Sequence, residues 1–157
     1  MTATYDDLAG VVDLFGGLTR EELSRALAEL AFKQGREADE DALAAAIDDA
    51  IEDYYLVEYD REEADAPLLV PGPTAFPTLP ENAADLPHIM DAPDRSVDRA
   101  ALGEAVAKRL LAEAARAADD GDRDRVERLL DVSYDLEAWA PVEVTDVRDR
   151  LDAALQD

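Results

Sequence analysis

Negative charge is the feature that most limits how this chain can fold. Of its 157 residues, 39 are Asp or Glu and 15 are Lys or Arg, which gives a formal net charge of -24. At ordinary salt such a surface repels itself and opposes a compact state. At about 1 M salt the Debye length shrinks to roughly 3 Å, and most of this repulsion disappears. The charge therefore predicts a protein that folds in a salt-rich solvent.

Two further features of the composition fit a salt-rich interior. Lysine occurs only at Lys33 and Lys108, whereas 13 residues are arginine, and alanine is the commonest residue with 30 copies. A salting-out solvent strengthens apolar burial, so small apolar side chains suffice for a core there. The acids are spread along the chain instead of being gathered in a tail. This distribution favours adaptation to high salt over an ordinary acidic protein.

The expected location follows from what the sequence lacks. It has no cysteine, which excludes disulfides and thiolate metal sites. No apolar run approaches the roughly 20 residues of a membrane span. The N-terminus carries acids instead of a basic and apolar export signal. We therefore expect a soluble cytoplasmic protein that does not bind membranes.

Apolar residues at helical spacing predict three helices, at about residues 4–15, 19–35 and 39–54. Thr19 and Glu22 predict a capping box at the second helix, and Asp39 is a good N-cap for the third. The apolar pattern then alternates, which predicts a β-hairpin. Its parts are a strand at residues 55–59, an acidic turn at residues 60–66 and a returning strand at residues 68–70. Three helices followed by a hairpin is the order of a winged helix.

Seven of the eight prolines lie between Pro67 and Pro93. Proline restricts its own backbone and favours extended conformations in the residue before it. Apolar residues recur in this stretch, so we expect an extended segment held across the helices; they are Phe76, Leu79, Leu86, Ile89 and Met90. Three further helices are predicted beyond it, the first capped by Ser96, the second by Asp122 and the last starting at Thr145. Residues 134–144 are less regular.

The predicted fold class is α+β and mostly α. Residues 1–71 form a winged-helix-like part with three helices and a hairpin, residues 72–95 a proline-rich connector, and residues 96–157 a helical C-terminal part. Because the connector is apolar enough to pack, we expect the helical parts to share one core as a single domain.

No catalytic residue emerges from the sequence. His88 is the only histidine, and the only serines are Ser24, Ser96 and Ser133. A catalytic triad needs an imidazole beside its nucleophile, and no serine lies in a nucleophile-elbow sequence. We therefore interpret His88 as a packing or surface residue and assign no catalytic residue.

Phosphate and metal motifs also fail in detail. Gly16 and Gly17 precede a helix but lack the further glycines and the lysine of a phosphate-binding loop. The acidic run around Gly121 resembles a calcium loop, yet positions 1 and 3 of such a loop would be Arg116 and Ala118 instead of carboxylates. A helix end followed by a new N-cap explains this run. We expect no cofactor and assign no cofactor-binding or metal-ligating residue.

The third predicted helix would read DNA in a winged helix. It carries seven acids and no base, so phosphates would be repelled and few counterions released. A protein partner is therefore favoured over DNA.

Residues 95–128 mix acids and bases at helical spacing, for example Arg109 with Glu113, which fits ion pairs or a contact surface. We expect Trp139, the only tryptophan, to fix the last helix to the rest of the fold.

Three segments carry a resemblance to a known family. They are LAGVVDLFGGLTREELSRALAELAFKQG at residues 8–35, GPTAFPTLPENAADLPHIMD at residues 72–91, and RVERLLDVSYDLEAWAPVEVTDVRDRLDAAL at residues 125–155. Together they resemble a family of proteins of unknown function from halophilic archaea. The resemblance implies a salt-rich cytoplasm and one self-contained protein, and it supplies no activity or site residue.

Three functions stay open on this evidence. The favoured hypothesis is a non-catalytic protein-interaction or regulatory module with a protein partner. The first alternative is an enzyme that uses a divalent metal and carboxylates, which needs several acids in one concave pocket. The second alternative is a winged-helix DNA-binding regulator. The sequence leaves the oligomeric state open.

Overall fold

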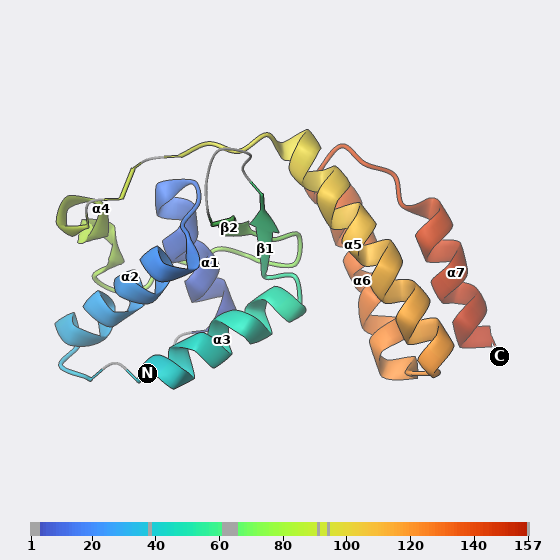
Figure 1. The fold of residues 1–157 in the computed structure, drawn as a ribbon, viewed down its shortest axis with the longest axis horizontal. Helices are drawn as coiled ribbons and strands as arrows, with labels where there is room; N and C mark the ends of the chain where they lie inside the picture. The colour runs from blue at the N-terminus through green and yellow to red at the C-terminus, as the bar shows by residue number, and fades with distance from the viewer. Residues whose placement is uncertain (1–3, 38, 61–65, 91, 94, 157) are drawn as a thin grey trace. The chain divides into compact units, whose positions relative to one another are not determined.

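The computed structural model describes residues 4–37, 39–60, 66–90, 92–93 and 95–156. The described elements are seven α-helices, a short 3-10 turn and a two-stranded antiparallel hairpin (Figure 1). The fold is therefore α+β and mostly α, as predicted. None of the described helices is both long and apolar enough to span a membrane. The chain divides into two compact units, residues 1–97 and residues 98–157, called here the N-terminal and C-terminal units.

The N-terminal unit begins with three helices and a hairpin, in the predicted order. Its elements are α1 (Tyr5–Phe15), α2 (Arg20–Lys33), α3 (Glu40–Glu52), β1 (Leu56–Tyr59), β2 (Leu68–Pro71), the 3-10 turn η1 (Ala83–Asp85) and α4 (Leu86–Ile89). In the hairpin, Leu56 pairs with Pro71 and Tyr59 with Leu68. Residues 61–65 of the predicted acidic turn lie outside the described residues.

Side-chain caps fix where α2 and α3 begin. Thr19 and Glu22 form the predicted capping box of α2, because each side chain accepts a hydrogen bond from the other's backbone N–H. Asp39 caps α3 as predicted. These caps satisfy N–H groups that the first helical turn cannot pair internally.

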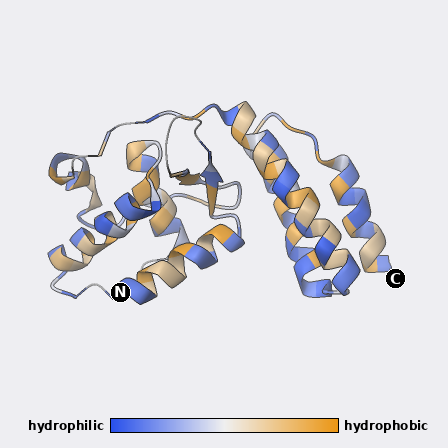
Figure 2. Ribbon diagram, viewed as in Figure 1, coloured by the Kyte–Doolittle hydropathy of each residue, from blue (hydrophilic) through white to orange (hydrophobic). Residues whose placement is uncertain are grey.

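The core of the N-terminal unit forms where the apolar faces of these elements meet (Figure 2). Its fully buried side chains include Leu8, Val12, Leu18, Leu23, Ile47 and Leu56. Leu18 also pairs with Leu69 through two backbone hydrogen bonds of 3.1 and 2.7 Å. The loop between α1 and α2 is thereby joined to the hairpin.

The proline-rich connector differs from its prediction in two ways. Residues 83–89 are helical, and Pro87 is tolerated there because it lies in the first turn of α4, where a missing N–H costs no hydrogen bond. Its apolar side chains also divide: Leu86 and Met90 are buried, whereas Phe76, Leu79 and Ile89 are exposed.

Polar groups hold the first part of the connector against α1. The Asp6 carboxylate accepts a hydrogen bond from the Phe76 N–H, and the Asp6 backbone carbonyl accepts one from the Thr78 N–H. The Thr78 hydroxyl donates to the Asp7 carboxylate over 2.7 Å. A Cβ added at Gly10 would lie only 1.8 Å from the Thr78 carbonyl oxygen. Only glycine allows the two backbones to come this close.

The end of the connector is held at the start of α2. The Arg95 guanidinium forms a two-pronged ion pair with Glu22, with N···O distances of 2.6 and 3.1 Å, and donates to the Gly17 carbonyl. The Arg95 N–H donates to the Phe15 carbonyl over 2.8 Å.

The C-terminal unit consists of three helices, α5 (Arg99–Asp120), α6 (Arg123–Trp139) and α7 (Thr145–Gln156). Their facing sides bury leucine and valine, among them Leu102, Leu110, Leu129, Leu136 and Leu151. Gly121 ends α5 in the left-handed conformation, and Asp122 caps α6 as predicted. The predicted Arg109–Glu113 ion pair is present at 2.6 Å, and Glu113 also pairs with Arg125.

Two expectations for this unit need correction. Asp98, not Ser96, caps α5, because its carboxylate accepts hydrogen bonds from the next helical N–H groups. Helix α6 continues to Trp139, because buried Leu136 extends its apolar stripe. Trp139 is only half buried, and the Arg99 guanidinium of α5 lies over its ring, 4.4 Å from the ring centroid.

Candidate functional site

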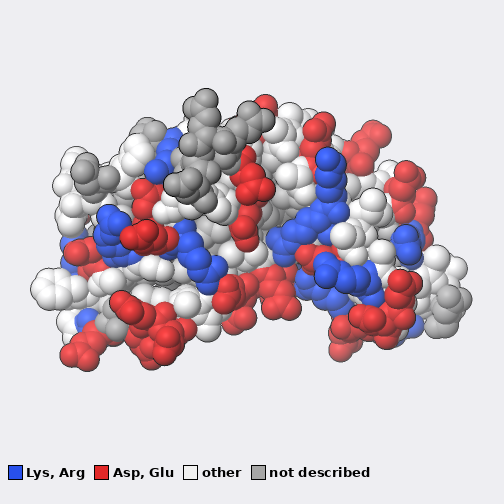
Figure 3. Space-filling view, in the orientation of Figure 1, with Lys and Arg blue, Asp and Glu red and all other residues white. Residues whose placement is uncertain are grey.

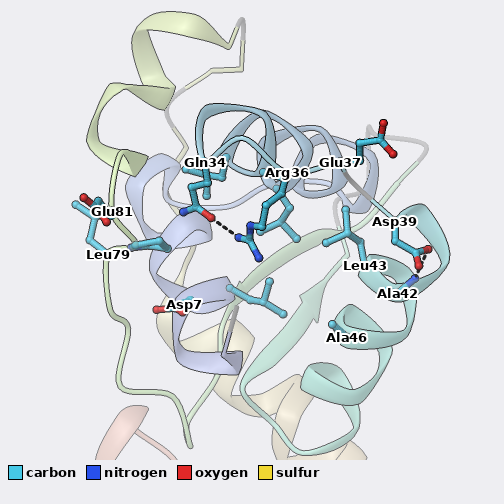
Figure 4. A pocket seen from close by; sticks show the side chains of 15 residues that line it. Asp7, Gln34, Arg36, Glu37, Asp39, Ala42, Leu43, Ala46, Leu79 and Glu81 are labelled. Carbon is cyan, nitrogen blue, oxygen red and sulfur yellow. Dashed lines mark hydrogen bonds between the residues drawn. The ribbon is translucent and has the colours of Figure 1, made fainter. Parts of the chain in front are cut away.

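An open cavity of about 380 Å³ lies between α1, α2, α3 and residues 79–81 of the connector (Figure 4). Its floor is apolar and comes from the core-facing stripes of the helices: Leu8, Leu27, Leu30, Ala31, Leu43 and Ala46. Leu43 packs against the core but stays partly exposed. The volume lies at the small end of the range for binding sites, so the cavity suits one or two side chains. This cavity is called the α2–α3 pocket below.

Polar side chains surround the mouth of the α2–α3 pocket. Figure 4 places Asp7 and Glu81 on one side, Glu37 and Asp39 on the other, and Arg36 between them. The mouth therefore carries four carboxylates and one guanidinium.

Two of these carboxylates are engaged by neutral donors. Asp39 accepts hydrogen bonds from the N–H groups of Asp41 and Ala42, at 3.1 and 3.2 Å. Burial of the Asp7 carboxyl raises its pKa, but hydrogen bonds from Thr78 and Thr4 outweigh burial and hold the pKa below its usual value. The Asp7 carboxylate therefore stays charged near neutral pH.

The other charged groups of the mouth differ in their contacts with the rest of the protein. Arg36 donates a hydrogen bond to the Gln34 side chain. Glu37 and Glu81 are exposed and have neither a hydrogen bond nor an ion pair to any described residue. These two carboxylates are available to a binding partner.

An exposed apolar side chain extends the floor of the pocket outward. Leu79 lines the mouth and is 52% exposed. It lies one residue from Thr78, which is held by the polar contacts with α1. The mouth thus has a fixed apolar edge that a partner can cover.

The residues considered for catalysis do not assemble. His88 lies exposed on α4, and no described residue pairs with it. Ser133 is buried in α6 and donates a hydrogen bond to the Leu130 carbonyl. Ser24 lies on α2, and Ser96 precedes α5.

Carboxylates are abundant on the surface but do not converge. They gather along α3 (Figure 3), where five are exposed: Glu40, Asp41, Asp48, Asp49 and Glu52. In the part of the chain that the structure describes, no three acidic or histidine side chains are arranged to hold a metal ion. The metal-dependent alternative therefore has no candidate site there.

A second, wider cavity of about 870 Å³ lies between α2, α3 and the hairpin. Arg20 crosses from α2 to α3 beside it and pairs with Asp48 at 2.5 Å. Ala66 forms part of its wall, next to residues outside the described ranges. The α2–α3 pocket, whose apolar floor is edged by exposed Leu79, is the candidate site.

The fold and the pocket define a small, mostly helical α+β protein with an acidic surface and an open apolar cavity. The chain belongs to a family described as "Family of unknown function (DUF7109)", whose model matches residues 6–156. No curated protein and no solved structure matches the chain.

Proposed function

We propose that this protein is a non-catalytic interaction module of a salt-rich, halophilic archaeal cytoplasm, and that its α2–α3 pocket receives an apolar side chain of a partner protein. The observation that carries this proposal is the open apolar floor, walled by three helices of the core and edged by exposed Leu79. An exposed apolar surface with a polar rim is typical of a protein-binding site.

The N-terminal unit is winged-helix-like in this proposal. The order of three helices and a hairpin supports it, as does the pairing of Leu18 with Leu69, which adds a third extended segment beside the hairpin. A protein partner remains favoured over DNA, because the solvent-facing side of α3 is acidic and would repel phosphates.

Selection from a random peptide library tests the proposal. Purified protein in 2 M potassium chloride is used as bait, and selected peptides are measured by fluorescence anisotropy. We expect peptides with a large apolar residue, because burying one contributes roughly 1.5–3 kcal/mol. The variant Leu43→Arg fills the pocket floor with charge, so it should weaken binding at least about tenfold.

Two further variants separate binding from folding. Leu79→Arg changes only an exposed side chain at the mouth and should also weaken binding, without loss of helical signal. Ala45→Arg places the same charge on the exposed side of α3, outside the pocket, and should bind like the parent protein. Selection of no peptide, or equal binding by all three variants, contradicts the proposal.

A further inference from the structure

The charges at the mouth specify the partner more closely, on the condition that the α2–α3 pocket binds a protein segment as proposed above. We propose that the segment carries one large apolar side chain between basic side chains, preferably arginine. Its apolar residue enters the pocket, and its basic residues reach Glu37 and Glu81.

The mouth is complementary to such a segment on both sides. One side carries Asp7 and Glu81 and the other carries Glu37 and Asp39, with the apolar floor between them (Figure 4). The hydrogen bonds to Asp7 and Asp39 come from neutral groups and do not remove their negative charge. Arg36 supplies one opposing charge, so the mouth retains an excess of three negative charges.

High salt determines which of these charges act on a partner. At about 1 M salt the Debye length is roughly 3 Å, so charges that do not touch are screened. Only direct ion pairs then contribute. Glu37 and Glu81 are exposed and have no partner among the described residues, so both can form direct pairs with a bound segment.

The chemistry of the pairs favours arginine on the partner. A guanidinium can donate two parallel hydrogen bonds to one carboxylate, as Arg95 does to Glu22 in this protein. Such exposed pairs typically contribute about 0.2–1 kcal/mol each. The apolar residue therefore supplies most of the affinity, and the two carboxylates select among apolar segments by a few-fold each.

The experiment compares the flanks of peptides selected in the same library. We expect Arg, and less often Lys, within three residues of the apolar anchor. For a selected peptide, replacing its basic flanks by Glu should weaken binding about tenfold. The variant Glu37→Lys/Glu81→Lys should reverse that preference. The control Glu104→Lys/Glu127→Lys makes the same change in net charge at exposed positions of the C-terminal unit and should leave it unchanged.

The outcomes separate this inference from the proposed function. Peptides that depend on Leu79 but show no basic flanks, or a reversal by the control variant, overturn the inference and leave the pocket as a binding site. Sedimentation that shows a dimer dissociated by Leu79→Arg overturns it too, because the occupant is then a second copy. Selection of no peptide at all removes both.

Discussion

Glu22 illustrates at the residue scale how one carboxylate stabilises several parts of this fold. It caps α2 through the Thr19 N–H and pairs with Arg95 at the end of the connector. Burial of the Glu22 carboxyl raises its pKa, but hydrogen bonds and charge from Arg95, together with Thr19, outweigh burial and lower the pKa below its ordinary value of 4.5. The charged form is therefore the one that the folded state stabilises.

Glu22→Gln should destabilise the protein by about 1–2 kcal/mol at pH 7, because Arg95 loses a charged partner while the amide can still cap α2. The folded-state pKa lies below the unfolded one, so the ionised carboxylate stabilises above about pH 4.5 and the contribution is lost as the pH falls through the folded-state pKa. Urea unfolding in 2 M potassium chloride measures this difference between pH 7 and pH 3.

Its neighbour Glu21 provides the matched control. The Glu21 side chain is 87% exposed and lies 4.0 Å from Arg25, so Glu21→Gln should change the stability very little. A stability loss in Glu22→Gln that stayed constant down to pH 3 would show that packing, and not the ion pair, is responsible.

Local signals at the scale of elements explain what the sequence could predict. A capping box such as Thr19 and Glu22 involves residues three apart, so its geometry is written in the sequence. The predicted start of α5 was two residues too early, because Ser96 and Asp98 are both good caps. Contacts of the connector with α1 and α2 decide where the connector leaves the N-terminal unit, and such contacts cannot be read from the local sequence.

The α2–α3 pocket could not be predicted from periodicity. Leu27, Leu30 and Leu43 lie on the same apolar stripes as the core residues, and periodicity does not show which stripe positions lack an opposing side chain. The apolar pattern also suggested that Leu79 is buried. The connector is held by Thr78 instead, which leaves Leu79 exposed at the mouth.

The close approach of the connector to α1 gives an element-scale prediction. Gly10→Ala should destabilise the protein by about 2 kcal/mol or more, although alanine is the better helix former by about 1 kcal/mol. The added Cβ would lie 1.8 Å from the Thr78 carbonyl oxygen, so the connector must move and the Thr78–Asp7 hydrogen bond is lost. Urea unfolding measures the effect, and a more stable variant would contradict the close approach.

The junction of α6 and α7 gives a second prediction at this scale. Glu137 accepts hydrogen bonds from the Val144 N–H at 2.9 Å and from Arg148 at 2.7 Å. Glu137→Ala should destabilise the C-terminal unit by about 2–3 kcal/mol, because it leaves both donors without this acceptor. Thermal melting followed by circular dichroism measures the loss. Glu143→Ala, at an exposed position nearby, should melt like the parent protein.

At the scale of the whole molecule, charge is distributed unevenly between the two units. Residues 1–97 hold 23 acids and 6 bases, whereas residues 98–157 hold 16 acids and 9 bases. The excess of negative charge per residue is therefore larger in the N-terminal unit. In the C-terminal unit, ion pairs such as Arg125–Glu113 and Arg148–Glu137 offset part of the repulsion without added salt.

Lowering the salt concentration should therefore unfold the protein, and the N-terminal unit should lose its helices first, because its repulsion depends most on screening by ions. Circular dichroism across a potassium chloride titration follows helices in both units. Fluorescence of Trp139, the only tryptophan, follows the C-terminal unit alone. We expect the helical signal to begin to fall at a higher salt concentration than the one at which the fluorescence changes.

Sucrose strengthens folding without screening charge, so it separates the two effects of salt. An unchanged helical signal near zero salt would contradict the dependence on salt. Coincident transitions would instead show that the units unfold together.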